Sequence, residues 1–182
     1  MRLMLLVASM QSQSVNRRLL QHAYQYFADK HSNIELDWVE LKDYDLPLYN
    51  ADIEKQRGLP TAALEFVERV EQAHGIVIAS PEYNHSTPAP LKNLIDWVSR
   101  QTPSAWYRHS ILLMSASPAS AGGNRGLWQT RIPLEACGAF VFPEMFSLSN
   151  AWEMLPESNS ELPEQSQQNL HKLLSEFVEW TF

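Results

Sequence analysis

Four short runs of consecutive apolar residues, separated by stretches with helical spacing, constrain the fold of this chain more than any other feature. The runs are residues 3–8, 76–79, 111–114 and 139–142. Because each run is apolar on successive residues, we expect strands that are covered on both faces. Residues 34–38 alternate apolar and polar side chains instead, which predicts an edge strand with one wetter face.

Apolar residues recur at helical spacing between these runs. The helical stretches are residues 15–26, 64–70, 91–98 and 170–177, with a weaker one at 125–136 that Pro133 is expected to interrupt. Strand and helix patterns therefore alternate five times along 182 residues. This alternation predicts one α/β domain, residues 1–182, in which helices cover both faces of a mostly parallel sheet.

Composition excludes several classes of function. Fourteen basic residues oppose 21 acidic ones, giving a formal charge of −7 that disfavours nucleic acid or an anionic membrane as partner. Cys137 is the single cysteine, so no intrachain disulfide can form, and the six histidines show no metal-ligand spacing. No signal peptide or membrane-spanning stretch is apparent, and a cytoplasmic location is the default expectation.

In doubly wound sheets, ligands bind beyond the carboxyl ends of the strands, where the strand order reverses. Three loops are expected at that edge: residues 9–16, 81–88 and 117–124. Two further irregular stretches, at about 42–60 and 155–163, are the longest connections that the pattern predicts.

The first loop, 9–16, lacks both the glycine fingerprint of dinucleotide-binding folds and the Gly-Lys-Ser/Thr of NTPase loops. The loop can surround one terminal phosphate with its hydroxyls, the Asn16 amide and the backbone N–H groups at a helix start. The alternative is plain helix capping by Ser14.

The second loop, 81–88, is a run of polar residues with one tyrosine, held between a core strand and a helix start that contains proline. It presents a fixed edge of backbone N–H and C=O groups of the kind that hydrogen-bonds to a flavin ring. The alternative is an ordinary turn between strand and helix. The third loop, 117–124, holds two of the six glycines. Paired glycines allow close approach to a flat ligand, or a flexible turn without one.

Together the three loops resemble those of the NADPH-dependent FMN reductase family, a flavodoxin-fold group of quinone, azo-dye and chromate reductases. The resemblance spans roughly residues 1–145. Its strongest part is Pro81-Glu82-Tyr83-Asn84-His85-Ser86 with Pro88, Leu91, Lys92, Asn93, Ile95, Asp96 and Trp97. Weaker matches are residues 45–50, residues 115–118 with Gly122 and Gly123, and Ser9, Ser14 and Asn16.

The resemblance implies a flavodoxin-like three-layer sandwich with a five-stranded parallel sheet in the order 2-1-3-4-5. It implies FMN as cofactor, NAD(P)H as electron donor, and two-step (ping-pong) transfer to a small acceptor. Quinone is the first expectation, followed by azo compounds, metal oxyanions and free flavin, and a homodimer or homotetramer is expected. The alternative is a non-catalytic flavin-binding electron carrier or redox sensor.

The resemblance assigns no catalytic side chain and no metal site, because the flavin carries the chemistry. The expected cofactor-binding residues are Ser9, Gln11, Ser14, Val15, Asn16, Pro81, Glu82, Tyr83, Asn84, His85, Ser86, Ser117, Gly122 and Gly123. His85 is open to two interpretations, as a proton donor to the acceptor or as a residue that offers only its backbone.

The first loop departs from the family pattern. Ala8 stands where the family usually has glycine, and Gln11 and Ser12 replace a common arginine and lysine. Loss of two cations removes charge-assisted bonds worth about 1.5–3 kcal/mol each. Arg17 or Arg18 is the candidate to compensate.

Overall fold

The computed structural model describes residues 1–156 and 161–182, and it contains a parallel sheet of six strands. The strands are β1 (Arg2–Val7), β2 (Glu35–Glu40), β3 (Gly75–Ala79), β4 (Ser110–Ala116), β5 (Phe140–Val141) and β6 (Phe146–Leu148). Their order is β2-β1-β3-β4-β5, with β6 also pairing with β4. The flavodoxin-like order 2-1-3-4-5 is thereby confirmed.

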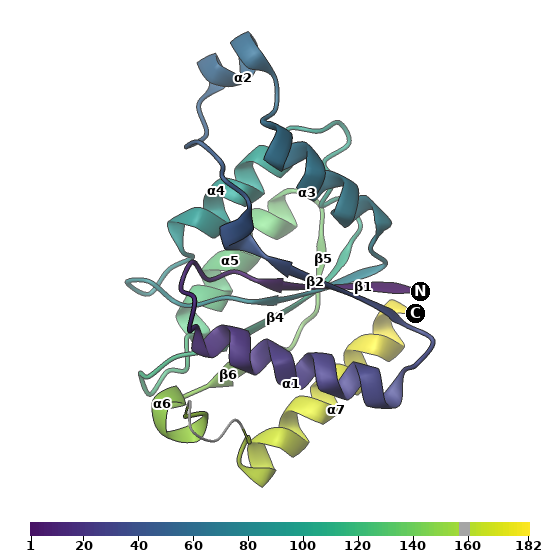
Figure 1. The fold of residues 1–182 in the computed structure, drawn as a ribbon, viewed down its shortest axis with the longest axis vertical. Helices are drawn as coiled ribbons and strands as arrows, with labels where there is room; N and C mark the ends of the chain where they lie inside the picture. The colour runs from purple at the N-terminus through teal and green to yellow at the C-terminus, as the bar shows by residue number, and fades with distance from the viewer. Residues whose placement is uncertain (157–160) are drawn as a thin grey trace.

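Helices cover both faces of the sheet (Figure 1). They are α1 (Val15–Lys30), α2 (Ala51–Arg57), α3 (Thr61–Gln72), α4 (Ala89–Val98), α5 (Asn124–Ala136), α6 (Ala151–Met154) and α7 (Glu164–Thr181), with a 3-10 turn η1 (Leu41–Asp43). In Figure 1, α1 and α7 lie on one face and α3, α4 and α5 on the other, while α2 projects away from the sheet. None of the helices in the described ranges has the length and apolar content that a membrane crossing requires.

Successive residues of the central strands enter two separate cores. In β1, Leu3 and Leu5 pack into the core beneath α1 and α7, whereas Met4 and Leu6 pack into the core beneath α3, α4 and α5. All four side chains are fully buried. This two-sided burial explains why the strand reads as a continuous apolar run instead of alternating.

The fifth position of the sheet is divided between two short strands. β5 pairs with Ser110 and Ile111 at the beginning of β4, and β6 pairs with residues 114–116 at its end. Pro143 lies between them, where it has no N–H to donate to a ladder. Arg131 donates to the carbonyls of Val141 at 2.9 Å and Phe142 at 2.8 Å. The interruption is thus stabilised by a side chain from α5.

β2 has one wetter face, as predicted, but that face carries Leu36 and Trp38, and not Asp37. β2 is the edge strand as expected, but Asp37 and Val39 are buried while Leu36 and Trp38 are only partly covered. Arg2 pairs with the Asp37 carboxylate at 3.2 Å, and Arg69 pairs with it from α3. Two cations therefore replace the water that the sequence pattern predicts around Asp37.

The stretch 42–60 is less irregular than predicted. It contains the end of η1 and the helix α2, which Asn50 caps by accepting a hydrogen bond from the Asp52 N–H at 2.8 Å. α2 buries no residue, so it has no apolar stripe by which periodicity detects a helix. α5 continues through Pro133 without the expected interruption and ends three residues later. Residues 157–160 of the predicted connector lie outside the described residues.

Candidate functional site

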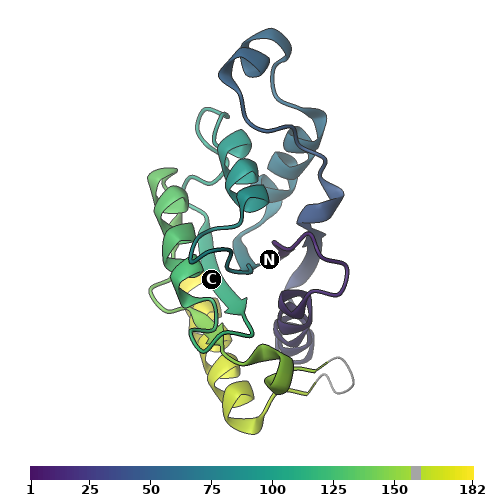
Figure 2. The same cartoon turned by 90° about the vertical axis from the view of Figure 1, so that its left-hand side faces the viewer.

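The loops after β1, β3 and β4 meet at the carboxyl edge of the sheet, which faces the viewer in Figure 2. β1 pairs with β2 on one side and β3 on the other, so the strand order reverses there. The Ala8 N–H donates to the Ala79 carbonyl at 2.9 Å, and the Ser80 N–H donates to the Met114 carbonyl at 2.9 Å. The structure therefore brings the three predicted loops together at the reversal of strand order, where α/β folds bind ligands.

The first loop is held by its own hydroxyl groups. The Ser14 Oγ accepts a hydrogen bond from the Asn16 N–H at 3.2 Å and caps α1, so the capping interpretation is confirmed. The Ser9 Oγ accepts from the Gln11 N–H at 3.3 Å. Both serine side chains are buried. They shape the loop from within, and its outer surface consists of Met10, Gln11, Ser12 and Gln13.

The Asn16 side chain bonds to the backbone at the end of β4. Its Oδ1 accepts from the Ala116 N–H at 2.8 Å, and its Nδ2 donates to the Ala116 carbonyl at 3.0 Å. The residue is buried. Asn16 thus joins the start of α1 to the end of β4 and fixes the first loop relative to the third.

Arg17 and Arg18 turn in different directions. The Arg17 Nε donates to the Glu40 Oε1 at 2.8 Å, and its guanidinium lies 5.7 Å from the centre of the Trp38 ring. Arg17 is therefore directed toward β2. Arg18 lines a hollow of about 240 Å³ beside the first loop, and its Nη2 donates to the Leu155 carbonyl at 3.2 Å. The other residues of this hollow are Gln11, Gln13, Val15, Trp152 and Pro156.

The Glu40 carboxylate, which pairs with Arg17, is expected to make the stability of the fold depend on pH in the acid range. Partial burial raises its pKa, but hydrogen bonds from Lys42, Arg17 and Trp38 outweigh this and lower the pKa to about 2. Because the pKa is lower in the folded than in the unfolded chain, the ionised Glu40 carboxylate stabilises the fold above about pH 5. This stabilisation is lost as the pH falls toward about 2 and the carboxylate becomes protonated.

We expect Glu40→Gln to lower the free energy of unfolding near pH 7 by on the order of 2 kcal/mol. The deficit relative to the parent chain should shrink between about pH 5 and pH 3, because the parent carboxylate loses its advantage there. Urea unfolding across this range measures both quantities. A deficit that is independent of pH would contradict the expectation.

The second loop contains a two-residue hairpin. Tyr83 and Ser86 exchange backbone hydrogen bonds, at 3.1 Å from the Tyr83 N–H and 3.0 Å from the Ser86 N–H. Asn84 and His85 between them have φ of 51° and 62°, the type I′ pattern, and Asn and His are among the side chains that tolerate it best. Within the described part of the chain, no protein group accepts from the amides of Asn84 and His85. These exposed amides form a short, rigid donor edge.

α5 anchors this hairpin. The Glu82 Oε2 accepts from the Gly126 N–H at 2.7 Å, and the Glu82 side chain is only 7% exposed. The Glu82 Oε1 lies 3.2 Å from the His85 Nδ1, and the Thr87 hydroxyl bonds to that of Thr130 at 2.9 Å. A Cβ on Gly126 would stand 3.0–3.2 Å from Glu82 atoms, so this glycine lets α5 approach the loop. Glu82 therefore positions the hairpin.

The two glycines of the third loop are buried against the protein itself. Gly122 has φ of 61°, and a Cβ there would lie 2.9 Å from the Ser149 N. Gly123 has φ of 84°, and its Cβ would lie 2.0 Å from the Ser115 Oγ. Both need glycine because of internal packing and backbone conformation. The Ser117 Oγ accepts from the Ala119 N–H at 3.3 Å and also supports the loop.

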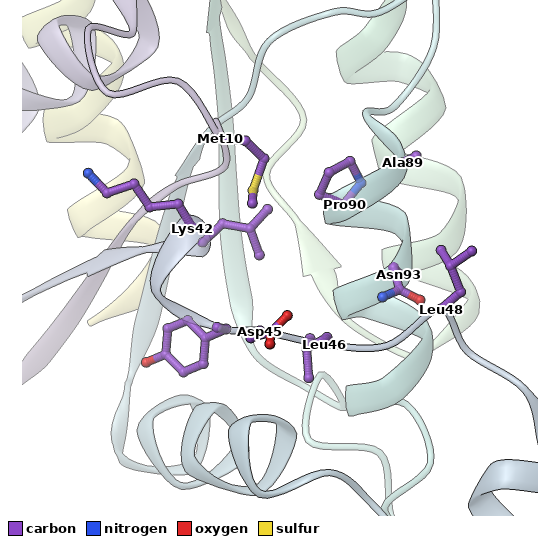
Figure 3. A pocket seen from close by; sticks show the side chains of 10 residues that line it. Met10, Lys42, Asp45, Leu46, Leu48, Ala89, Pro90 and Asn93 are labelled. Carbon is purple, nitrogen blue, oxygen red and sulfur yellow. The ribbon is translucent and has the colours of Figure 1, made fainter.

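A second hollow, of about 390 Å³, adjoins the site and was not expected from the sequence (Figure 3). Figure 3 shows the Met10 side chain of the first loop pointing into the space between residues 41–48 and the start of α4. Its lining is Met10, Leu41, Lys42, Tyr44, Asp45, Leu46, Leu48, Ala89, Pro90 and Asn93. Most of these side chains are apolar, which suits a flat organic molecule.

Asn93 and Trp97 hold the outer wall of this hollow. The Asn93 Oδ1 accepts from the Tyr49 N–H at 2.8 Å, and its Nδ2 donates to the Pro47 carbonyl at 2.9 Å. The Trp97 Nε1 donates to the same carbonyl at 2.8 Å. Both residues belong to the helix-start signature, which the sequence identifies without assigning them a role. Their function is to fix the segment after η1 against α4.

Comparison with known proteins agrees with this arrangement. Residues 1–153 match the family of NADPH-dependent FMN reductases. An NAD(P)H:quinone oxidoreductase of Solanum tuberosum is 33% identical over 178 residues, covering 93% of this chain and 87% of the relative. A quinone reductase of Escherichia coli K12 is 38% identical over 97 residues, covering 53% of this chain and 52% of the relative.

Among solved structures, the flavoenzyme NAD(P)H:(acceptor) oxidoreductase FerB from Paracoccus denitrificans superposes with a TM-score of 0.81 at 24% identity. The alignment covers 99% of this chain and 96% of FerB, so the two share one fold throughout. With a family match over residues 1–153 and a relative aligned to nearly the whole chain, this protein belongs to the NADPH-dependent FMN reductase family.

Proposed function

We propose that this protein is an FMN-dependent NAD(P)H:quinone oxidoreductase that transfers electrons in two separate steps. Family membership and relatives named as quinone reductases support the proposal. The observation that carries it is the hairpin at 83–86, whose outward amides stand beside the reversal of strand order. Bound FMN would supply two-electron chemistry, taking a hydride from NAD(P)H and delivering electrons to the acceptor.

The donors at the carboxyl edge suit a singly phosphorylated flavin. The first loop leads into α1, a helix of 16 residues whose N-terminal amides and dipole favour a phosphate. The hairpin offers backbone N–H groups for the acceptor atoms of the ring. We propose that binding involves Ser9, Gln11, Ser14, Val15, Asn16, Pro81, Glu82, Tyr83, Asn84, His85, Ser86, Ser117, Gly122 and Gly123.

Within this set we distinguish residues that contact the cofactor from residues that position the loops. Gln11 is exposed, and the amides of Asn84 and His85 have no partner among the described residues, so these groups would make contacts. Asn16, Glu82 and Gly123 are occupied with protein partners, so they would act by fixing the three loops relative to each other. The hollow beside Met10 would accept the flat quinone, since its lining is mainly apolar and it adjoins the loops.

Reconstitution tests the proposal. The purified protein is loaded with FMN, freed of excess, and assayed for oxidation of NADPH and of NADH with a panel of quinones, an azo dye, chromate and free flavin. We expect stoichiometric FMN, quinone-dependent turnover, and parallel lines in double-reciprocal plots because the donor leaves before the acceptor binds. Stoichiometric FMN without turnover would indicate an electron carrier, and no affinity for flavin would overturn the proposal.

We further propose a homodimer or homotetramer. Several large apolar side chains on the α5 and β5 side of the molecule are exposed, namely Tyr107, Trp128, Ile132 and Phe140. Such a group of side chains is typical of protein interfaces. Analytical ultracentrifugation at micromolar concentration is expected to show at least a dimer, and a monomer would overturn this part of the proposal.

A further inference from the structure

We propose that Arg18 supplies the positive charge for the FMN phosphate, in place of any cation in the first loop. The inference rests on the proposed function. Residues 9–16 contain neither lysine nor arginine. A phosphate monoester carries close to two negative charges near neutral pH, and an arginine guanidinium binds it through two parallel hydrogen bonds. A cation within reach of the loop is therefore expected to contribute strongly to binding.

The helix geometry places Arg18 beside the loop. Arg18 follows the cap Ser14 by four residues and Val15 by three, so it shares their face of α1. Helical side chains lean toward the N-terminus, which brings the guanidinium of Arg18 back over the preceding turn. The structure agrees, because Arg18 lines one hollow together with Gln11, Gln13 and Val15.

The C-terminal end of α6 supports the arginine in this position. The Leu155 carbonyl accepts from the Arg18 Nη2 at 3.2 Å. Trp152 of the same segment lines the hollow and is 71% exposed. A guanidinium has five N–H donors and can serve more than one acceptor, so this support is compatible with a phosphate contact. Two segments distant in sequence thus combine beside the loop.

Arg17 is a natural matched control. It is adjacent in sequence, carries the same charge and is also partly buried, but its guanidinium is directed toward Glu40 and Trp38 of β2 and not toward the first loop. A general effect of net charge on flavin binding would be the same for both arginines. A specific phosphate contact would appear for Arg18 alone.

The experiment compares dissociation constants for FMN and for riboflavin, which has the same ring without the phosphate. Titrations followed by flavin fluorescence use the parent chain, Arg18→Ala, Arg18→Lys and Arg17→Ala, each at low and high salt. We expect Arg18→Ala to weaken FMN binding by about 10- to 100-fold, the range for loss of a charge-assisted contact, and to leave riboflavin binding unchanged. Arg18→Lys should restore part of the affinity, and Arg17→Ala should bind both ligands like the parent.

The salt dependence gives a second readout. If Arg18 contacts the phosphate, raising the salt concentration should weaken FMN binding to the parent more than to Arg18→Ala, because that charge is absent from the variant. Equal effects of Arg18→Ala on FMN and riboflavin, or no effect on either, would overturn the inference while the proposed function stands. A folded parent chain that binds neither flavin would overturn both. Circular dichroism establishes folding, and Arg18→Gln, which also removes the charge, replaces Arg18→Ala if the alanine variant does not fold.

Discussion

Replacing Gly123 with alanine is expected to lower the free energy of unfolding by about 3 to 5 kcal/mol and to disturb the third loop. Two costs combine at this position. The backbone has φ of 84°, which an alanine adopts only with strain. The new Cβ would also lie 2.0 Å from the Oγ and 2.9 Å from the Cβ of Ser115, a fully buried residue with little room to move.

Gly58 separates these two costs. It has φ of 73° at the end of α2, and a Cβ there would have no neighbour within 4 Å. Its ψ of −161° lies in a region that is essentially confined to glycine, so Gly58→Ala should cost a conformational term alone, about 1 to 3 kcal/mol. Urea denaturation of both variants measures the difference, and Ser115→Ala combined with Gly123→Ala should recover part of the steric loss. If Gly123→Ala and Gly58→Ala lost the same unfolding free energy, the clash of the new Cβ with Ser115 would not contribute as we expect.

The Asn16→Ala variant is expected to lose about 2 to 5 kcal/mol of stability, because it leaves the buried N–H and carbonyl of Ala116 without their partners. It should also weaken the binding of FMN and of riboflavin to the same extent, because the substitution loosens the first loop from the third and changes no charge. This equal effect distinguishes a residue that positions loops from Arg18, whose effect should follow the phosphate.

Two further variants test the Asn16 contacts. Asn16→Asp keeps an acceptor for the Ala116 N–H but places a carboxylate against the Ala116 carbonyl, so it should not restore stability. Asn169→Ala removes an exposed amide on α7 that accepts a hydrogen bond from Gln165, and it should change the unfolding free energy by less than about 0.5 kcal/mol. Chemical denaturation gives the stabilities and fluorescence titration the affinities. If Asn16→Asp were as stable as the parent chain, the two hydrogen bonds between the Asn16 side chain and Ala116 would not both stabilise the fold.

The candidate site follows from the sequence at the level of segments. The runs at 3–8, 76–79 and 111–114 predict buried strands, and parallel strands place the loops that follow them on one edge. The motif at 81–86 identifies the middle loop. The structure then shows that its residues 83–86 form a hairpin with α5 behind it, a contact with residues about 40 positions away.

Roles within the segments were less predictable. The glycines at 122 and 123 suit close approach to a ligand in the sequence, but in the structure they pack against Ser149 and Ser115. Periodicity also missed α2, which buries nothing, and the division of the fifth strand around Pro143. In each case the deciding contact, or its absence, depends on a neighbour that local pattern does not reveal.

The sequence by itself determined the layered α/β fold and the loops that form the site, because burial on one or both faces leaves a periodic signature in local residue types. Only the tertiary structure decided what individual side chains do. Asn16 meets Ala116 a hundred residues away, and Arg17 and Arg18, adjacent and chemically identical, have different partners. A side chain's partner depends on which segments the completed fold brings next to it, and that information is not local.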